Sequence, residues 1–186
     1  MILILNGSPN KDSATMTISN DLIKKSKEEV IIINTYDLNI TSCDDCKYCS
    51  KKIGCKYKDD MEKIYDLLYQ TDTLILSSPI YFGAFSDTLL KVLNRFQRYY
   101  GQKYDLKDNN TPTVTNLITV TTQGSLRKEM FNGAKLTHSI LTSLLKPTYD
   151  DLIQAKNSDK EMPLSQKYII KKIKKVSLKL RFNVSQ

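Results

Sequence analysis

The sequence lacks tryptophan, has a single histidine, and contains no G-x-S-x-G motif. Without that nucleophile elbow a serine hydrolase is disfavoured, and we expect the one histidine, His138, to be a helix surface or core residue with no catalytic role. No apolar run approaches the roughly 20 residues that a helix needs to cross a bilayer, so no membrane span is expected. Because Met1 leads directly into a short apolar run, with no leader of the signal-peptide type, we expect a cytoplasmic protein.

The glycine-rich phosphate motifs are also absent from the first loop. Residues 2–5 form an unbroken apolar run typical of a buried parallel strand, and Asn6, Gly7, Ser8 and Pro9 end it. No Gly-Lys-Ser/Thr follows, and the second and third glycines of the dinucleotide fingerprint are missing. What remains is a turn of small and hydroxyl residues before a helix that Ser13 can cap, which suits a phosphate held by backbone N–H groups and the helix dipole. Our hypothesis is that the phosphate belongs to flavin mononucleotide (FMN).

Length and composition predict one globular domain spanning residues 1–186, with 40% hydrophobic and 26% charged residues. The net charge of +8 comes largely from the C-terminal stretch, and we expect its cations to form a solvated helix face. Alternatively they attract an anionic nucleotide or a nucleic acid, but no other part of the chain resembles a nucleic-acid motif. The cations of this stretch are Lys167, Lys171, Lys172, Lys174, Lys175, Lys179 and Arg181.

Strand and helix patterns alternate along the chain. Apolar runs predict strands at residues 2–5, 30–33, 73–76, 114–120 and 149–155, and helical spacing predicts helices at about 15–27, 61–68, 87–99, 130–145 and 163–180. Such alternation implies a parallel sheet with right-handed crossovers. The predicted fold is therefore an α/β, flavodoxin-like three-layer sandwich with a five-stranded parallel sheet of order 2-1-3-4-5. Ligands of that fold bind at the carboxyl ends of the strands, where the loops after the first, third and fourth strands meet.

These loops carry motifs that resemble the NAD(P)H-dependent FMN reductases, and in particular their iron–sulfur flavoprotein branch. The resemblance covers about residues 1–125 and rests on Gly7-Ser8-Pro9, residues 13–15, the cysteine segment, Asp59-Asp60-Met61 and residues 78–83. It implies contacts to FMN from three groups of residues. They are Ser8, Asn10, Ser13, Ala14 and Thr15 around the phosphate; Pro79, Ile80, Tyr81, Phe82 and Gly83 along the isoalloxazine; and Thr121, Thr122, Gln123 and Gly124 on its other side.

Two positions depart from the family pattern. Ala14 stands where many relatives carry a polar side chain, so one phosphate contact has to come from the backbone alone. Asn94 precedes Arg95 where relatives commonly have an acidic residue, so no charge partner is assigned to Arg95 from the sequence.

All four cysteines lie within a predicted insert at about residues 42–58, with the spacing C-x2-C-x2-C-x5-C. Disulfides are disfavoured in a reducing compartment. A compact triple followed by a fourth cysteine suits a 4Fe-4S cluster better than structural zinc, which usually pairs C-x2-C knuckles across a longer insert. A cluster, zinc and four free thiols remain open, and the ligands for a metal are Cys43, Cys46, Cys49 and Cys55.

The predicted function is an FMN-dependent oxidoreductase, in which the flavin supplies the chemistry and no side chain is an obligatory catalyst. Electrons would pass from NAD(P)H to a quinone, a free flavin, a nitro or azo compound, or a cluster. The alternatives are an electron carrier with FMN and a 4Fe-4S cluster but no NAD(P)H activity, and a metal-binding interaction module. The resemblance also implies a homodimer or higher homo-oligomer, for which Phe96, Tyr99, Tyr100 and Tyr104 would supply apolar surface.

Overall fold

The computed structural model describes residues 1–180. Its central sheet has the order β2-β1-β3-β5-β6, in which every neighbouring pair is parallel, and a short sixth strand, β4, pairs antiparallel with β3. The strands are β1 (Ile2–Asn6), β2 (Val30–Asn34), β3 (Thr73–Tyr81), β4 (Ala84–Phe85), β5 (Asn116–Thr122) and β6 (Tyr149–Ala155). The predicted flavodoxin-like order is confirmed, and β4 is the one strand that the sequence did not predict.

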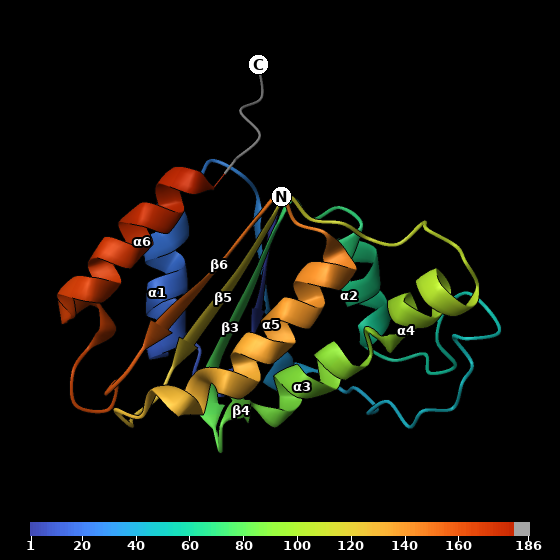
Figure 1. Cartoon of the computed structure of the whole chain (residues 1–186), viewed down its shortest axis with the longest axis horizontal. Helices are drawn as coiled ribbons and strands as arrows, with labels where there is room; N and C mark the ends of the chain where they lie inside the picture. The colour runs from blue at the N-terminus through green and yellow to red at the C-terminus, as the bar shows by residue number, and fades with distance from the viewer. Residues whose placement is uncertain (181–186) are drawn as a thin grey trace.

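Helices cover both faces of this sheet, as Figure 1 shows, with α1 and α6 on one side and α2, α3 and α5 on the other. The helices are α1 (Ala14–Ile23), α2 (Met61–Leu68), α3 (Asp87–Asn94), α4 (Gln97–Tyr100), α5 (Asn132–Leu145) and α6 (Lys167–Lys179), with short helical turns η1 (Thr35–Asp37), η2 (Gly101–Asp105), η3 (Lys128–Phe131) and η4 (Pro163–Ser165). No helix within residues 1–180 combines the length and apolar character needed to span a membrane.

The alternation of side chains along the strands builds two separate cores. In β1, Leu3 and Leu5 join the core under α2, α3 and α5, while Ile2 and Ile4 join the core under α1 and α6. All four side chains are fully buried. A strand that is apolar at every position is typical of a parallel sheet covered on both faces, which explains the unbroken apolar run at the start of the chain.

Several predicted elements differ from the structure. The strand predicted at 114–120 is β5 at 116–122, and the helix predicted at 15–27 ends at Ile23. The third strand continues past Leu76 to Tyr81, because Ser78 and Pro79 still pair with Thr121 and Thr122 of β5. The helix predicted at residues 87–99 is split into α3 and α4 on either side of Arg95 and Phe96. The segment after α4, for which no element was predicted, begins with the π-helical turn η2.

The C-terminal cations form an exposed face on α6, with Lys167, Lys171 and Lys174 exposed and Lys172 bound to Asp151 at 2.6 Å. This supports the expectation of a solvated face. Arg181 was counted with these cations and lies outside the described residues. His138 is buried in α5 between Thr119 and Asp150, as expected for a core histidine.

Candidate functional site

The loop after β1 folds back on itself to form the N-terminus of α1. Asn6 Oδ1 accepts a hydrogen bond from the Ser8 N–H at 3.0 Å, and Ser8 Oγ accepts one from the Asn10 N–H at 3.2 Å. Ser13 caps the helix by accepting from the Met16 N–H at 3.3 Å, as the sequence predicted. The first N–H groups of a helix have no acceptor inside it, so those of Ala14 and Thr15 remain for an anion.

The loop after β3 is a tight hairpin whose tip is strongly exposed. Phe82 and Gly83 connect β3 to β4, and both have a positive φ, at 51° and 79°. This is the backbone requirement of a type I′ turn, which glycine meets readily and phenylalanine does not. The Tyr81 side chain is 48% exposed and Phe82 is fully exposed, so both rings are available to a flat ligand.

Gly7 brings these two loops into direct contact. A Cβ atom added at Gly7 would lie 2.6 Å from Ser86 Oγ, 2.8 Å from Leu89 Cβ and 3.1 Å from Ser78 Oγ. No larger residue fits there without displacing its neighbours. The Gly7 N–H also donates to the Ser77 carbonyl at 2.7 Å, which ties the end of β1 to β3.

The loop after β5 is held by the segment that follows β6. The Gln123 N–H donates to the Ala155 carbonyl and the Ser158 N–H donates to the Gln123 carbonyl, both at 3.0 Å. The Gln123 side-chain amide closes its own loop by donating to the Ser125 carbonyl at 3.1 Å. The carboxylate of Asp159 lies directly against Gly124, in space that a Cβ at this position would occupy.

Several buried polar atoms at this edge of the sheet have no hydrogen-bond partner within residues 1–180. They are Ser86 Oγ, Thr121 Oγ1 and Gln123 Oε1. An unpaired polar atom away from water costs about 1–3 kcal/mol, so such atoms are usually satisfied in the working protein. Their position beside the three loops fits a polar ligand that accepts and donates hydrogen bonds, as a flavin does.

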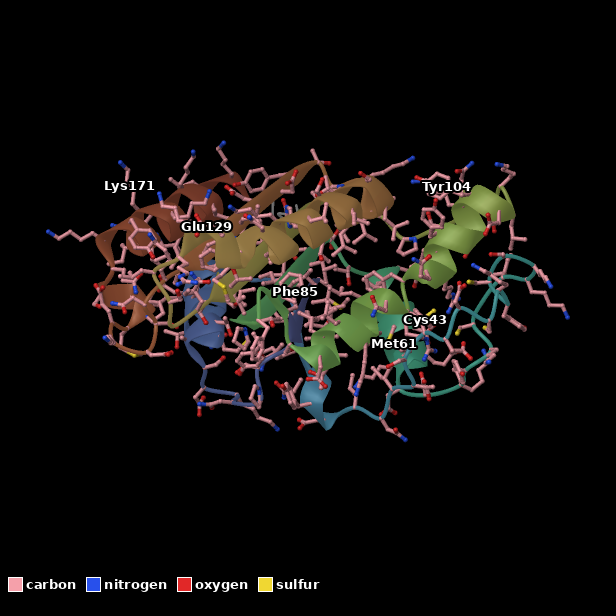
Figure 2. All side chains as sticks on the ribbon, turned by 60° about the horizontal axis from the view of Figure 1, so that its bottom comes forward. Cys43, Met61, Phe85, Tyr104, Glu129 and Lys171 are labelled. Carbon is pink, nitrogen blue, oxygen red and sulfur yellow. The ribbon has the colours of Figure 1, made fainter. Side chains whose placement is uncertain are left out.

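The four cysteines line a second site, a cavity of about 230 Å³ between the cysteine segment and α4. Arg95, Arg98 and Gly101 line the same cavity. Figure 2 shows Cys43 at the same end of the molecule as Tyr104 and at the opposite end from Lys171. The thiols are free in this structure.

Burial raises the pKa of the Cys49 thiol, and the negative charges of Cys43, Cys55 and Cys46 raise it further. Cys49 Sγ donates to the Gln97 carbonyl at 3.6 Å, which docks the segment on α4.

The backbone around Cys46 is turned sharply on both sides. Asp45 and Lys47 have φ values of 54° and 58°, and Gly54 has a φ of 108° before Cys55. The left-handed backbone conformation is strained for residues other than glycine, and such residues are found most often at ligand sites. Alternation of left- and right-handed residues also turns successive N–H groups toward one point, an arrangement found at many iron–sulfur sites.

Among the described residues, no three His, Cys, Asp or Glu side chains come close enough together to hold one metal ion. A single tetrahedral zinc would bring four thiolates to within roughly 3.8 Å of one another. A 4Fe-4S cube separates its four thiolates, because each binds a different iron. Four cysteines around a shared cavity fit that larger group.

Comparison with known proteins places the chain in a family. The sequence model of the NADPH-dependent FMN reductases matches residues 1–114. The chain belongs to the NADPH-dependent FMN reductase family. The matched region contains β1 to β4, the first two ligand loops and all four cysteines.

Relatives within this family carry a more specific name. An iron-sulfur flavoprotein of Archaeoglobus fulgidus is 29% identical over 118 residues, covering 62% of this chain and 58% of the relative. An iron-sulfur flavoprotein of Methanocaldococcus jannaschii is 32% identical over 94 residues, covering 49% and 48%. The chain therefore spans about half the length of the relatives that it matches.

Solved structures share the fold at low sequence identity. An NAD(P)H:quinone oxidoreductase from Methanothermobacter marburgensis has a TM-score of 0.72 at 11% identity, covering 98% of both chains. An FMN-dependent NADH-azoreductase from Bacillus anthracis, solved in complex with FMN, has a TM-score of 0.64 at 12% identity, covering 96% of both chains. These similarities confirm the predicted flavodoxin-like architecture of this FMN reductase family member.

The predicted flavin residues lie on the loops and strand ends of one sheet edge, except Ala14 and Thr15, which form the first turn of α1. Asn6 pairs with Ser77 and Pro79 pairs with Thr122, so β1, β3 and β5 end side by side. Six of these residues are buried: Ser8, Thr15, Ile80, Thr121, Thr122 and Gln123. The apolar Ile80 side chain packs in the core under α3 and α5, so only its backbone is available to a ligand.

The sequence missed three features of these sites. Ser86 and Asp159 lie beside Gly7 and Gly124, and no local pattern marks either of them. Arg95, which had no assigned partner, forms a buried ion pair with Asp59 at 2.8 Å. Of the four aromatic residues expected at an interface, Phe96 and Tyr99 pack in the core, whereas Tyr100 and Tyr104 are exposed.

Proposed function

We propose that this chain is an FMN-dependent oxidoreductase that takes electrons from NAD(P)H and passes them to a small acceptor such as a quinone, a flavin, or a nitro or azo compound. The observation that carries the proposal is the meeting of the loops after β1, β3 and β5, which leaves Ser86 Oγ and Thr121 Oγ1 buried without partners. Bound FMN supplies hydride and single-electron chemistry.

Each part of the edge has a role in binding. The N–H groups of Ala14 and Thr15 face the phosphate position with the positive end of the α1 dipole, and Ser13 fixes the first turn. The backbone at Gly83 permits close approach to a flat ring, while Tyr81 supplies an exposed aromatic face. Thr121 supplies a hydroxyl for the polar edge of the ring.

The cysteine cavity adds a second redox group to the proposal. A 4Fe-4S cluster would be held by Cys43, Cys46, Cys49 and Cys55. Electrons would enter or leave the protein through this cluster. The spacing, the shared cavity and the left-handed residues around Cys46 support this assignment. We propose in addition that the protein works as a homo-oligomer, with the exposed Tyr100 and Tyr104 at the interface.

The test is a visible spectrum of anaerobically purified protein, followed by addition of NADPH. We expect flavin bands, about four iron and four sulfide per chain, and rapid bleaching of the flavin. Flavin without bleaching by NADPH or NADH supports an electron carrier in place of the enzyme. Colourless protein that does not bind added FMN refutes the proposal, and salt-sensitive nucleic-acid binding by such protein supports an interaction module through the lysine face of α6.

A further inference from the structure

Arg95 is a buried cation that contacts both ends of the cysteine segment. Its side chain is 1% exposed and follows directly after α3. Nη1 donates to the Thr41 carbonyl at 2.7 Å and to Asp59 Oδ2 at 2.8 Å, and Nη2 donates to the Tyr57 carbonyl at 3.4 Å. Thr41 precedes the first cysteine and Tyr57 follows the last. One guanidinium therefore holds the two ends of the cysteine segment together, which we call the closure of the segment.

Asp59 completes this closure. Its Oδ2 also accepts the Thr41 N–H at 3.0 Å, and its Oδ1 accepts the Met61 N–H at 3.1 Å at the start of α2. Burial alone would lower the pKa of Arg95 and raise that of Asp59. The hydrogen bond between the two groups outweighs burial, so the pKa of Arg95 is raised and that of Asp59 is lowered. Both groups are charged at neutral pH, and a charge-assisted pair of this geometry is stronger than a neutral hydrogen bond.

The same guanidinium faces the cysteine cavity. Arg95 lines the cavity together with the four cysteines, and its Nε has no hydrogen-bond partner within residues 1–180. A buried cation beside the thiols stabilises a negatively charged group in the cavity. The stabilisation grows when that group gains an electron and becomes more negative.

We propose that Arg95 is the positioning residue of the cysteine segment, which it closes through Thr41, Tyr57 and Asp59, and that its charge raises the reduction potential of the cluster. The second part rests on the proposed function. A one-electron reduction of the cluster, by the reduced flavin or by dithionite, adds one negative charge beside Arg95. Removing the cation therefore disfavours the reduced state, whereas replacing it with another cation preserves most of the effect.

The experiment compares Arg95→Met and Arg95→Lys with Lys91→Met. Lys91 lies one turn earlier on α3, pairs with Asp87 at 3.8 Å and does not line the cavity, so this control removes the same charge elsewhere. Hydrogen exchange of residues 41–59 is measured in iron-free protein, and the midpoint potential of the cluster is measured after anaerobic reconstitution.

We expect Arg95→Met to speed exchange in residues 41–59 about tenfold and to lower the midpoint potential by about 59 mV, which is a tenfold change in the ratio of reduced to oxidised cluster for one electron. Arg95→Lys should speed exchange less and leave the potential near that of the parent. If Arg95→Met fails to fold, faster exchange in Arg95→Lys than in Lys91→Met supports the positioning role, and equal exchange refutes it.

The outcomes separate this inference from the function on which it rests. A parent protein that takes up no iron refutes the proposed cluster and with it the effect on potential, while the exchange data still decide the closure of the segment. A parent with a normal cluster, in which Arg95→Met and Lys91→Met behave alike in both measurements, overturns the inference and leaves the proposed function intact.

Discussion

Replacing Gly101 with alanine should loosen the cysteine segment without harming the helix in which Gly101 lies. A Cβ atom at this position would lie 2.8 Å from the carbonyl oxygen of Cys49, 2.9 Å from its carbonyl carbon and 3.2 Å from its Sγ. Two of these are backbone atoms, which cannot rotate away as the end of a flexible side chain can. Cys49 has to move for the methyl group to fit.

Two opposing effects decide the size of the change. Gly101 has helical angles, with φ −58° and ψ −46°, so alanine should stabilise the local helix by up to about 1 kcal/mol. Overpacking of a well-packed contact costs typically about 1–3 kcal/mol. The net cost weakens the docking of Cys49 by about 1–2 kcal/mol. This corresponds to roughly a tenfold larger population of molecules in which the cysteine segment is detached at Cys49.

The assay is the rate at which Cys49 is alkylated in iron-free protein, followed by mass spectrometry of the labelled peptide. We expect Gly101→Ala to raise this rate about tenfold and to lower iron retention after reconstitution, with the FMN content per chain unchanged. Lys103→Ala, in the same turn η2, serves as the control because Lys103 Nζ donates to the Ser143 carbonyl at 3.4 Å and Lys103 does not line the cysteine cavity. Equal alkylation rates in Gly101→Ala, the control and the parent would refute the packing argument.

Four further predictions follow from the described contacts. Ser13→Ala should lower stability by about 1 kcal/mol through loss of the helix cap and weaken FMN binding, as measured by thermal melting and flavin titration; unchanged affinity would contradict the role of the first turn. Gly7→Ala should cost about 1–3 kcal/mol and weaken FMN binding because its Cβ meets Ser86; an unchanged melting temperature would contradict this. Phe82→Asn should raise the melting temperature, since asparagine tolerates the left-handed conformation and the exposed ring buries nothing. The pKa of Asp59 is lowered in the folded protein, so its ion pair contributes stability at pH values above about 3.9, the pKa in the unfolded chain, and this stability is lost as the pH falls through the folded pKa. The melting temperature of Asp59→Asn should therefore depend less on pH between pH 2 and 6 than that of the parent.

The fold was predictable because its strands are unambiguous in local sequence. Residues 2–5 are apolar at every position, as expected for a strand with helices packed on both faces of its sheet. The strand at 149–155 was predicted with the bounds that the structure shows. Turn residues then located the carboxyl ends of these strands, and the parallel order placed three loops at one edge. Local pattern and tertiary structure agree in this part of the chain.

The rest depends on contacts between distant residues, which no local pattern encodes. The helix predicted at residues 87–99 breaks at Arg95 because that side chain is drawn into the cysteine segment by Thr41 and Asp59, which lie 54 and 36 positions away. From the sequence, Asp59 was named only as part of the Asp59-Asp60-Met61 motif, with no partner assigned. Its carboxylate does accept the Met61 N–H, but its second oxygen closes the segment.

The helix α3 links the two candidate sites. At its N-terminus the Ser86 N–H donates to Ser78 Oγ beside Gly7, and at its C-terminus Arg95 closes the cysteine segment. Eight helical residues span about 12 Å, so α3 sets the separation between the phosphate loop and the segment closure. Gly7→Ala acts beside the N-terminus of α3, whereas Gly101→Ala acts in η2, beyond α4, and the two positions share no contacting residue. Their effects on unfolding free energy should therefore add to within about 0.5 kcal/mol. A larger deviation in the double variant would show that a shift of α3 transmits strain from one site to the other.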